Sequence, residues 1–376
     1  MNVILLALLG CGQQPDTATS EGGDSCEGAP DLDGDGFSAC AGDCDDGSAR
    51  LFPYDRTGDG VPDACGWRDV NLGWAHSCAI DSAGAIACWG INDGSKYDFG
   101  QVDNIPEGTF SNISAGWAHS CAVSTDGALS CWGITGGDFD FGQVSLAPTG
   151  TFTAVSVDGM HGCALRTSGE VACWGITEAN DRLEFGQVSQ APTTPLQTII
   201  AGHYHQCGLN PDDTLNCWGR DSHGQISDTP LGDFRMVGSG CRHNCALALD
   251  GAVQCWGVDD GLDEKDHGQV TLTPEASFAS MAVGAYHNCA LDSAGAIACW
   301  GKDDDGQVSD APSGRFVSLY SGAFHSCALD DSGILACWGQ DVFGQVSGIP
   351  GQSITSARPP APAPESEAVC CDEWTR

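Results

Sequence analysis

Short apolar runs alternate with turn residues along most of the chain, and this arrangement returns seven times. In the second copy, apolar runs at 110–116, 119–123 and 129–133 are followed by a Gly-Gln-Val segment at 142–144. Gly, Asp, Asn and Ser separate the runs, which is typical of short β-strands joined by tight turns. No amphipathic stretch of helical length lies between them. The pattern predicts all-β structure with four short strands in each repeat.

Each repeat carries the same residues at fixed spacing. A histidine is followed two residues later by a cysteine, ten residues further on by a second cysteine, and then by Trp-Gly. The histidines are His76, His119, His161, His205, His243, His287 and His325. A repeat of about forty residues is typical of propellers and solenoids, and a closed ring of seven units leaves few exposed sheet edges. The sequence therefore predicts a seven-bladed β-propeller.

The two cysteines of each repeat flank a predicted hairpin turn. In the first repeat, a turn centred just before Gly84 places Cys78 opposite Cys88, with the glycine able to take a positive φ. Directly opposed residues in a non-hydrogen-bonded pair lie within disulfide range. We therefore predict one hairpin disulfide per repeat. The pairs are Cys78–Cys88, Cys121–Cys131, Cys163–Cys173, Cys207–Cys217, Cys245–Cys255, Cys289–Cys299 and Cys327–Cys337.

These motifs together resemble the regulator-of-chromosome-condensation repeat, a family of seven-bladed β-propellers. The residues that carry the resemblance are His-Ser-Cys-Ala-Ile/Leu, Gly-x-Ile/Val/Leu-x-Cys-Trp-Gly and Gly-Gln-Val, within residues 67–357. Intracellular members of the family usually have other residues where the paired cysteines stand here. That departure predicts an oxidising location, because disulfides persist outside the reducing cytosol.

All the variation in repeat length falls in one loop. Successive histidines lie 43, 42, 44, 38, 44 and 38 residues apart, and the segments from each repeat's Trp to the following Gln span 12, 11, 13, 7, 13, 7 and 7 residues. The insertions therefore enter units 1, 2, 3 and 5 at one position. Equivalent propeller loops emerge on one face, which suits a binding face, with surface loops that merely tolerate insertions as the alternative. The candidate partner-binding residues are Tyr97, Asp98, Asp138, Phe139, Asp140, Asp181, Glu184, Asp260 and Asp263.

The start of the chain resembles a bacterial lipoprotein signal. Its apolar stretch is too short to span a bilayer, and Leu8-Leu9-Gly10-Cys11 resembles a lipobox in which Cys11 is acylated. No Lys or Arg precedes the stretch, so an ordinary export signal or a start further upstream is the alternative. We expect a signal at 1–11, a flexible tether at 12–25, and a lipid-anchored protein of the bacterial outer membrane or cell surface.

An acidic segment containing cysteines, at 26–66, precedes the repeats. Carboxylates at positions 1, 3 and 5 with glycine at position 6 suit Ca²⁺, and the segment resembles thrombospondin type 3 repeats. Gly42 at position 12 excludes a full EF-hand, and Thr57 replaces an aspartate in the second copy. We expect structural calcium, with a solvated acidic spacer as the alternative. The predicted ligands are Asp31, Asp33, Asp35, Asp43, Asp45, Asp55, Asp59 and Asp63.

Eight cysteines lie outside the paired positions. Cys11 is the predicted lipid site. Four in the acidic segment can pair with one another in three ways, and the sequence does not distinguish these. A bond from Cys241 to one of two cysteines in the Pro-rich tail at 358–376 is a further possibility. These six are Cys26, Cys40, Cys44, Cys65, Cys370 and Cys371.

The chain carries 51 acidic and 14 basic residues, a formal net charge of −37. Nucleic-acid binding requires a basic surface that displaces counterions from phosphates, so nucleic acid is excluded as a partner. The nucleotide-exchange and chromatin roles of eukaryotic family members are not expected here. Complementarity instead favours a basic protein or an envelope polymer as the partner of a monomer.

No repeated residue predicts an active site. A catalytic residue is needed once, so a histidine in all seven units indicates a structural role, and we expect hydrogen bonds to the backbone. We expect the tryptophans and Gly-Gln pairs to pack blades and to satisfy turns, with His223 and His267 in positions that phenylalanine fills elsewhere. Without a nucleophile motif, we expect a binding scaffold rather than an enzyme. The alternatives are an inhibitor of an extracellular enzyme, like the β-lactamase inhibitory protein that the chain resembles, a cryptic polysaccharide-active enzyme, or a surface spacer.

Overall fold

The structure is a computed structural model of the whole chain. It describes residues 66–177, 184–259, 261, 264–331 and 333–350, and the backbone alone of 53–54 and 64–65. The chain divides into two units, Met1–Gly66 and Trp67–Arg376. In the first, strands β1 (Pro53–Tyr54) and β2 (Ala64–Cys65) pair antiparallel. The predicted acylated cysteine and all eight predicted calcium ligands lie outside the described residues.

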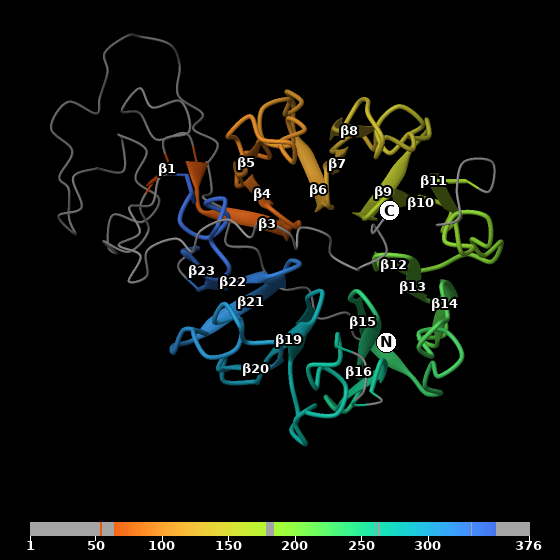
Figure 1. Ribbon diagram of the computed structural model, residues 1–376, viewed down its shortest axis with the longest axis vertical. Coiled ribbons are helices and arrows are strands. Elements are labelled where there is room, and N and C mark those ends of the chain that lie inside the picture. The colour runs from red at the N-terminus through yellow and green to blue at the C-terminus, as the bar shows by residue number, and fades with distance from the viewer. Residues whose placement is uncertain are drawn as a thin grey trace, which may run out of the picture. The chain divides into compact units, whose positions relative to one another are not determined.

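The second unit is a ring of seven three-stranded antiparallel sheets (Figure 1). Each sheet is one blade, formed by a contiguous stretch of chain. The blades are, in chain order, β3 (Trp67–Leu72), β4 (His76–Asp81) and β5 (Ile86–Gly90); β6 (Phe110–Ala115), β7 (His119–Ser124) and β8 (Leu129–Gly133); β9 (Phe152–Asp158), β10 (His161–Arg166) and β11 (Val171–Gly175); β12 (Thr198–Ala201), β13 (His205–Leu209) and β14 (Leu215–Gly219); β15 (Phe234–Ser239), β16 (His243–Ala248) and β17 (Val253–Gly257); β18 (Ser280–Val283), β19 (His287–Leu291) and β20 (Ile297–Gly301); β21 (Phe316–Ser321), β22 (His325–Asp330) and β23 (Leu335–Gly339).

The prediction of four strands per repeat is wrong. Each described blade has three, and the Gly-Gln-Val segment forms turns instead of an outer strand. The reason lies in the glutamine, whose side-chain carbonyl accepts the backbone N–H two residues earlier, as Gln101 does from Phe99 at 2.7 Å. That bond curls the backbone back on itself.

Among the described residues no helix could cross a membrane.

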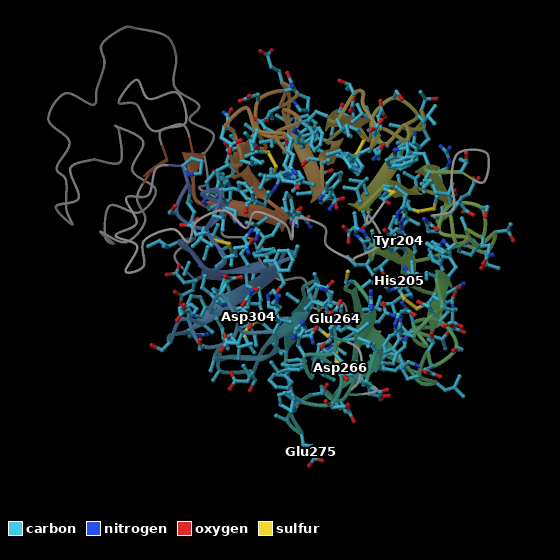
Figure 2. The ribbon with its side chains drawn as sticks, viewed as in Figure 1. Tyr204, His205, Glu264, Asp266, Glu275 and Asp304 are labelled. Carbon is cyan, nitrogen blue, oxygen red and sulfur yellow. A yellow bond between two sulfur atoms is a disulfide. The ribbon has the colours of Figure 1, made fainter. Side chains whose placement is uncertain are left out.

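The predicted hairpin register and all seven disulfides are confirmed. Cys78 lies opposite Cys88, and Gly84 has a φ of 89° in a turn where Asp81 Oδ1 accepts the N–H of Ala85 at 2.8 Å. The Cα atoms of the bonded cysteines are 4.0–4.1 Å apart in every blade. Figure 2 shows the disulfides as yellow bonds. The first cysteine of each pair is fully buried between blades, so the bond is part of the core.

Tryptophan links each blade to the one before it. The indole N–H of Trp132, for example, donates to the backbone oxygen of Gln101 at 2.9 Å. The same bond recurs at all seven interfaces, at 2.7–3.1 Å. Its seventh copy, from Trp89 to Gln345, joins blade 1 to blade 7 and closes the ring. The predicted inter-blade role of these residues is therefore confirmed.

The repeated histidines are structural, but their partners differ from the prediction. Nε2 of His76 bonds the hydroxyl of Ser120 in the next blade at 2.7 Å, and Nε2 of His325 bonds Ser77 across the closure at 2.8 Å. Three more follow this pattern with Asn244, Asn288 and Ser326. The expected bonds to backbone are wrong for these five, because the residue after the next blade's histidine points a short polar side chain at the ring.

Candidate binding face and central cavity

The variable loops all leave the hairpins at the same end. In blade 1, His76 pairs with Gly90, so the loop that follows Gly90 emerges where β4 begins. The hairpin turn at 82–85 lies at the other end of the same strands. This pairing of histidine with glycine recurs in all seven blades, which places the insertions on one face. We call it the insertion face.

Two predicted partner-binding aromatics pack inward on this face. The ring of Tyr97 meets Trp74 edge-on, with centroids 5.4 Å apart, and Phe139 meets Trp117 in the same way at 5.2 Å. Both side chains are half-buried members of a cluster that the two tryptophans centre. The insertions of blades 1 and 2 are therefore fixed against the propeller, and only part of each aromatic ring faces solvent.

Three predicted partner-binding acids hold their own loops. Asp98 accepts the N–H groups of Gly94 and Gly100, and Asp140 accepts that of Gly142. Glu184 accepts N–H groups from the residues that follow Gln187. Asp138 is exposed. Asp181, Asp260 and Asp263 lie outside the described residues.

The short loops use an aspartate that the sequence analysis did not single out. Asp221 accepts the N–H groups of residues 226 and 227 at 2.9 and 3.0 Å, and two other aspartates repeat the bonds in blades 6 and 7. These are Asp303 and Asp341. Each of these three aspartates lies three residues after the repeated tryptophan, and this fixed spacing could have identified them from the sequence. Much of the acidity of this face thus serves turn structure.

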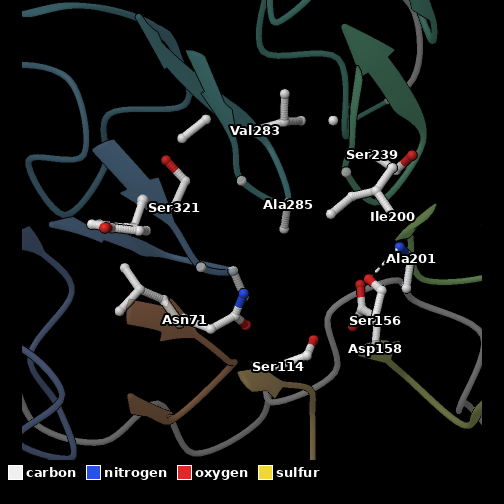
Figure 3. A pocket seen from close by; sticks show the side chains of 18 of the residues that line it. Asn71, Ser114, Ser156, Asp158, Ile200, Ala201, Ser239, Val283, Ala285 and Ser321 are labelled. Carbon is white, nitrogen blue, oxygen red and sulfur yellow. Dashed lines mark hydrogen bonds between the residues drawn. The ribbon is translucent and has the colours of Figure 1, made fainter. Parts of the chain in front are cut away.

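A cavity of about 250 Å³ lies at the centre of the ring, lined by the innermost strand of every blade. Figure 3 shows Asn71, Ser114 and Asp158 around it. Part of this polar lining links one blade to the next. Ser114 Oγ accepts the N–H of Val157 at 3.0 Å, and Ser156 Oγ accepts that of Ala201 at 2.8 Å. Asp158 is the one acidic side chain among the lining residues.

Asp158 breaks a rule that the other blades obey. Three residues before the repeated histidine, six blades have glycine, because an added Cβ would meet the next blade's backbone. At Gly73 it would lie 2.4 Å from the oxygen of Gly116. In blade 3 the close approach moves one residue on, to Gly159, whose Cβ would lie 2.9 Å from the oxygen of His203. The six glycines are Gly73, Gly116, Gly202, Gly240, Gly284 and Gly322.

The Asp158 carboxylate is oriented by two neighbours. Its Oδ1 accepts the N–H of Gly159 at 2.7 Å and lies 3.8 Å from Nδ1 of His203, whose side chain is buried. Burial acts to raise the pKa of Asp158, but the nearby His203 ring and the N–H of Gly159 outweigh it, and the pKa is lowered. One third of the aspartate side chain is exposed. The cavity therefore presents an ionised carboxylate.

Blade 3 also interrupts the histidine ring. Gly162 stands where blades 1, 2 and 7 have serine, so it offers His119 no side chain. Both ring nitrogens of His119 and His161 are buried without a hydrogen-bond partner, as is the amide of Gln206. A side chain at Gly162 would meet Trp174 at 2.6 Å. The departures from the repeat thus gather beside Asp158.

Among the described residues, no group of three or more His, Cys, Asp or Glu side chains is arranged to hold a metal ion. Cys241, which lines the cavity, is disulfide-bonded rather than a thiol.

Comparison with known proteins agrees with the repeat. Residues 110–143, 278–307 and 316–345 match the family described as Regulator of chromosome condensation (RCC1) repeat. No curated protein sequence matches the chain.

Solved structures with RCC1-type and related propellers have the same fold. The ectodomain of the receptor kinase CR4 from Physcomitrella patens is 23% identical, with a TM-score of 0.58, over 73% of this chain and 74% of that one. The ectodomain of ACR4 from Arabidopsis thaliana is 22% identical, with a TM-score of 0.58, over 76% and 99%. Prp20p from Saccharomyces cerevisiae, described with its binding to Gsp1p and histones, is 19% identical, with a TM-score of 0.52, over 70% and 83%. At these identities the likeness shows the fold alone.

The seven hairpin disulfides of the propeller indicate an oxidising environment, since such bonds do not persist in the cytosol.

Proposed function

We propose that the chain is an exported, lipid-anchored scaffold of the bacterial envelope that binds a basic protein or polymer through its insertion face. The observation that carries the proposal is the confinement of all repeat-length variation to loops that emerge on one face. A scaffold varies where it contacts its partner, whereas its strands stay uniform to preserve the ring.

Two further observations support the export and anchoring parts. The disulfides require an oxidising compartment, and the first eleven residues resemble a lipoprotein signal. Mass spectrometry of the protein purified from membranes tests the anchor. An acylated N-terminal Cys11 is expected, and an unmodified cysteine would contradict the proposal.

The binding face is tested by charge reversal on the full-length protein. Asp138→Lys changes an exposed acid of the insertion face, and Asp331→Lys changes an exposed acid of a hairpin turn at the other end of its strands. Affinity capture from envelope fractions should identify a partner that Asp138→Lys loses and Asp331→Lys retains. Shortening the insertions of units 1, 2, 3 and 5 to seven residues from Trp to Gln should abolish capture. A partner retained by the shortened variant would overturn the proposal.

The alternative of enzyme inhibition uses the same face and differs in outcome. If the captured partner is an extracellular enzyme, its turnover should fall on addition of the wild-type chain and recover with the shortened variant. A partner whose activity is unchanged, or which has none, favours the scaffold.

We also propose that the acidic segment binds structural Ca²⁺ through Asp31, Asp33 and Asp35 and their companions in the second copy. Calcium titration of the full chain by calorimetry should show saturable binding that Asp33→Asn weakens. Titration without measurable heat would contradict calcium binding and support the alternative, a solvated acidic spacer.

A further inference from the structure

We propose that the central cavity binds a protonated primary amine on an alkyl chain, with Asp158 as its counter-ion. The inference goes beyond the proposed function and does not depend on the insertion loops. It begins with the exception to the repeat. Six blades place glycine at this position to admit the neighbouring backbone, while blade 3 moves that glycine by one residue and places a carboxylate in the cavity wall.

The carboxylate is built into position. Oδ1 accepts the N–H of Gly159 at 2.7 Å and faces His203 at 3.8 Å, so its direction is fixed from two sides. Residues held this firmly on strands make precise sites, since little ordering is left to do on binding. One third of the side chain stays exposed, which leaves lone pairs available for a donor.

Charge selects a cation as the ligand. Among the described lining residues there is no Lys, Arg or Glu. Apart from His203, which faces Oδ1, the described lining therefore offers Asp158 no cationic side chain. A carboxylate in a partly desolvated wall gains most from a charge-assisted hydrogen bond with a cationic donor.

The rest of the lining suits an alkyl chain. Apolar side chains such as Leu72, Ile200 and Val283 come from blades around the ring, and serine hydroxyls lie between them. Two of these hydroxyls, those of Ser114 and Ser156, already accept backbone N–H groups. A single charged group on an apolar stem matches one carboxylate among apolar walls. The amine could belong to a small molecule or to a lysine side chain of a protein.

The test uses the full-length protein and calorimetric titration with n-pentylamine, with 1-pentanol as its uncharged counterpart. Two variants are needed. Asp158→Asn preserves shape and removes charge, and Asp158→Gly restores the residue that six blades carry. Asp138→Asn is the matched control, because it removes an exposed acid of the insertion face. Thermal unfolding should first establish that each variant folds.

The wild type and Asp138→Asn should bind pentylamine alike, with both Asp158 variants at least tenfold weaker and pentanol unbound. Equal binding by wild type and Asp158→Asn, or no binding by the wild type, would overturn the inference. Titration with a Lys-containing tripeptide, blocked at both ends, distinguishes the sources. Binding of the tripeptide as well as pentylamine indicates a lysine side chain of a protein, and binding of pentylamine alone a small molecule. Loop-shortened variants should keep amine binding, so failure here is separate from failure of the insertion face.

Discussion

At the scale of single residues, the seven repeated histidines make the fold sensitive to acid. All are fully buried, and burial is the main cause that lowers their pKa values from 6.5 to about 3 or about 4. An unfolded histidine takes up a proton below about pH 6.5, whereas the folded one does not until far lower pH. Their contribution to stability is therefore complete above pH 6.5 and falls as the pH drops towards 4.

We expect the propeller to unfold on acidification before pH 4, with uptake of several protons. Each histidine lowers the free energy of unfolding by up to about 1.4 kcal/mol per pH unit in this range. Circular dichroism against pH gives the midpoint, and denaturant titrations at several pH values give the slope. His119→Gln should reduce the slope by about one proton, because it removes one titrating group. The substitution breaks no hydrogen bond, since neither ring nitrogen of His119 has a partner. Stability that is unchanged between pH 7 and 4.5 would show that the pKa values are not lowered.

The sequence predicted the shared role of these histidines but not their partners. A repeated histidine indicates a structural position, but the atom that its ring bonds depends on the distance between that ring and the side chains of the next blade. The partner residue, Ser120 for His76, is about one repeat away in sequence and comes into contact only through the ring. Sequence alone likewise does not distinguish Asp158 from the other acidic residues, of which the chain has 51 in all with it. Its significance comes from the six glycines at equivalent positions.

At the scale of the element, each hairpin is stapled inside the core. Cys327 is fully buried, and the bond to Cys337 closes a short loop between β22 and β23. Chain-entropy arithmetic for such a loop gives about 2–3 kcal/mol, as an upper figure because the hairpin is already local. Replacing both cysteines by alanine should lower the free energy of unfolding by about 2 kcal/mol, measured by urea titration without reductant.

Burial gives the disulfides a second measurable property. Because one sulfur of each pair is inaccessible, thiol reagents should label none of the fourteen hairpin cysteines in the native protein, even in mild reductant. Non-reducing peptide mapping should find all seven pairs. Label at these positions in the folded state would exclude the oxidising location that the disulfides imply.

The hairpin was predictable because its determinants are local. Turn residues, a glycine with positive φ and the alternation of apolar residues fix the register within about ten residues. The absence of a fourth strand was not predictable, because a single side chain decides whether this segment forms a strand or a turn. Gln101 bonds to the backbone of Phe99 rather than extending, and composition alone does not reveal that preference.

At the scale of the whole molecule, the ring closes without exchange of strands between its ends. Blade 1 and blade 7 meet through Trp89 with Gln345 and Ser77 with His325. The tryptophan bond recurs at the other six interfaces, and the histidine bond at four of them. Among the described residues, this is the one interface that neither the chain nor a disulfide crosses. Trp89→Phe should therefore increase hydrogen exchange in β3 and β21–β23, along with a loss of about 1 kcal/mol for the hydrogen bond.

Trp300→Phe is the matched control, because it removes the same bond to Gln269 at an interior interface. It should lower stability by a similar amount without selectively opening β3 and β21–β23. An identical exchange pattern in the two variants would mean that the closure is no weaker than the interfaces that the chain spans.

The net charge of −37 also acts on the molecule as a whole. Self-repulsion opposes the compact state, and salt screens it over about 10 Å at 0.1 M. The melting temperature should rise as NaCl increases from about 10 mM to about 300 mM at fixed calcium, as measured by differential scanning calorimetry. The same charge should prevent retention on a DNA column at any of these concentrations. A melting temperature independent of salt would indicate that the acids lie too far apart to repel.

The tryptophan bond is the same at all seven interfaces, so the order of blades along the chain does not depend on which blade comes first. Each blade is a contiguous stretch, and the tryptophan bond at the closure repeats the one at the other six interfaces. The fold therefore has no intrinsic first blade. A gene whose propeller began at any inter-blade linker, with the old ends fused, would encode the same set of contacts in a cyclically permuted order. Lineages built on this ring could exchange their starting point while the cavity and the insertion face kept their places.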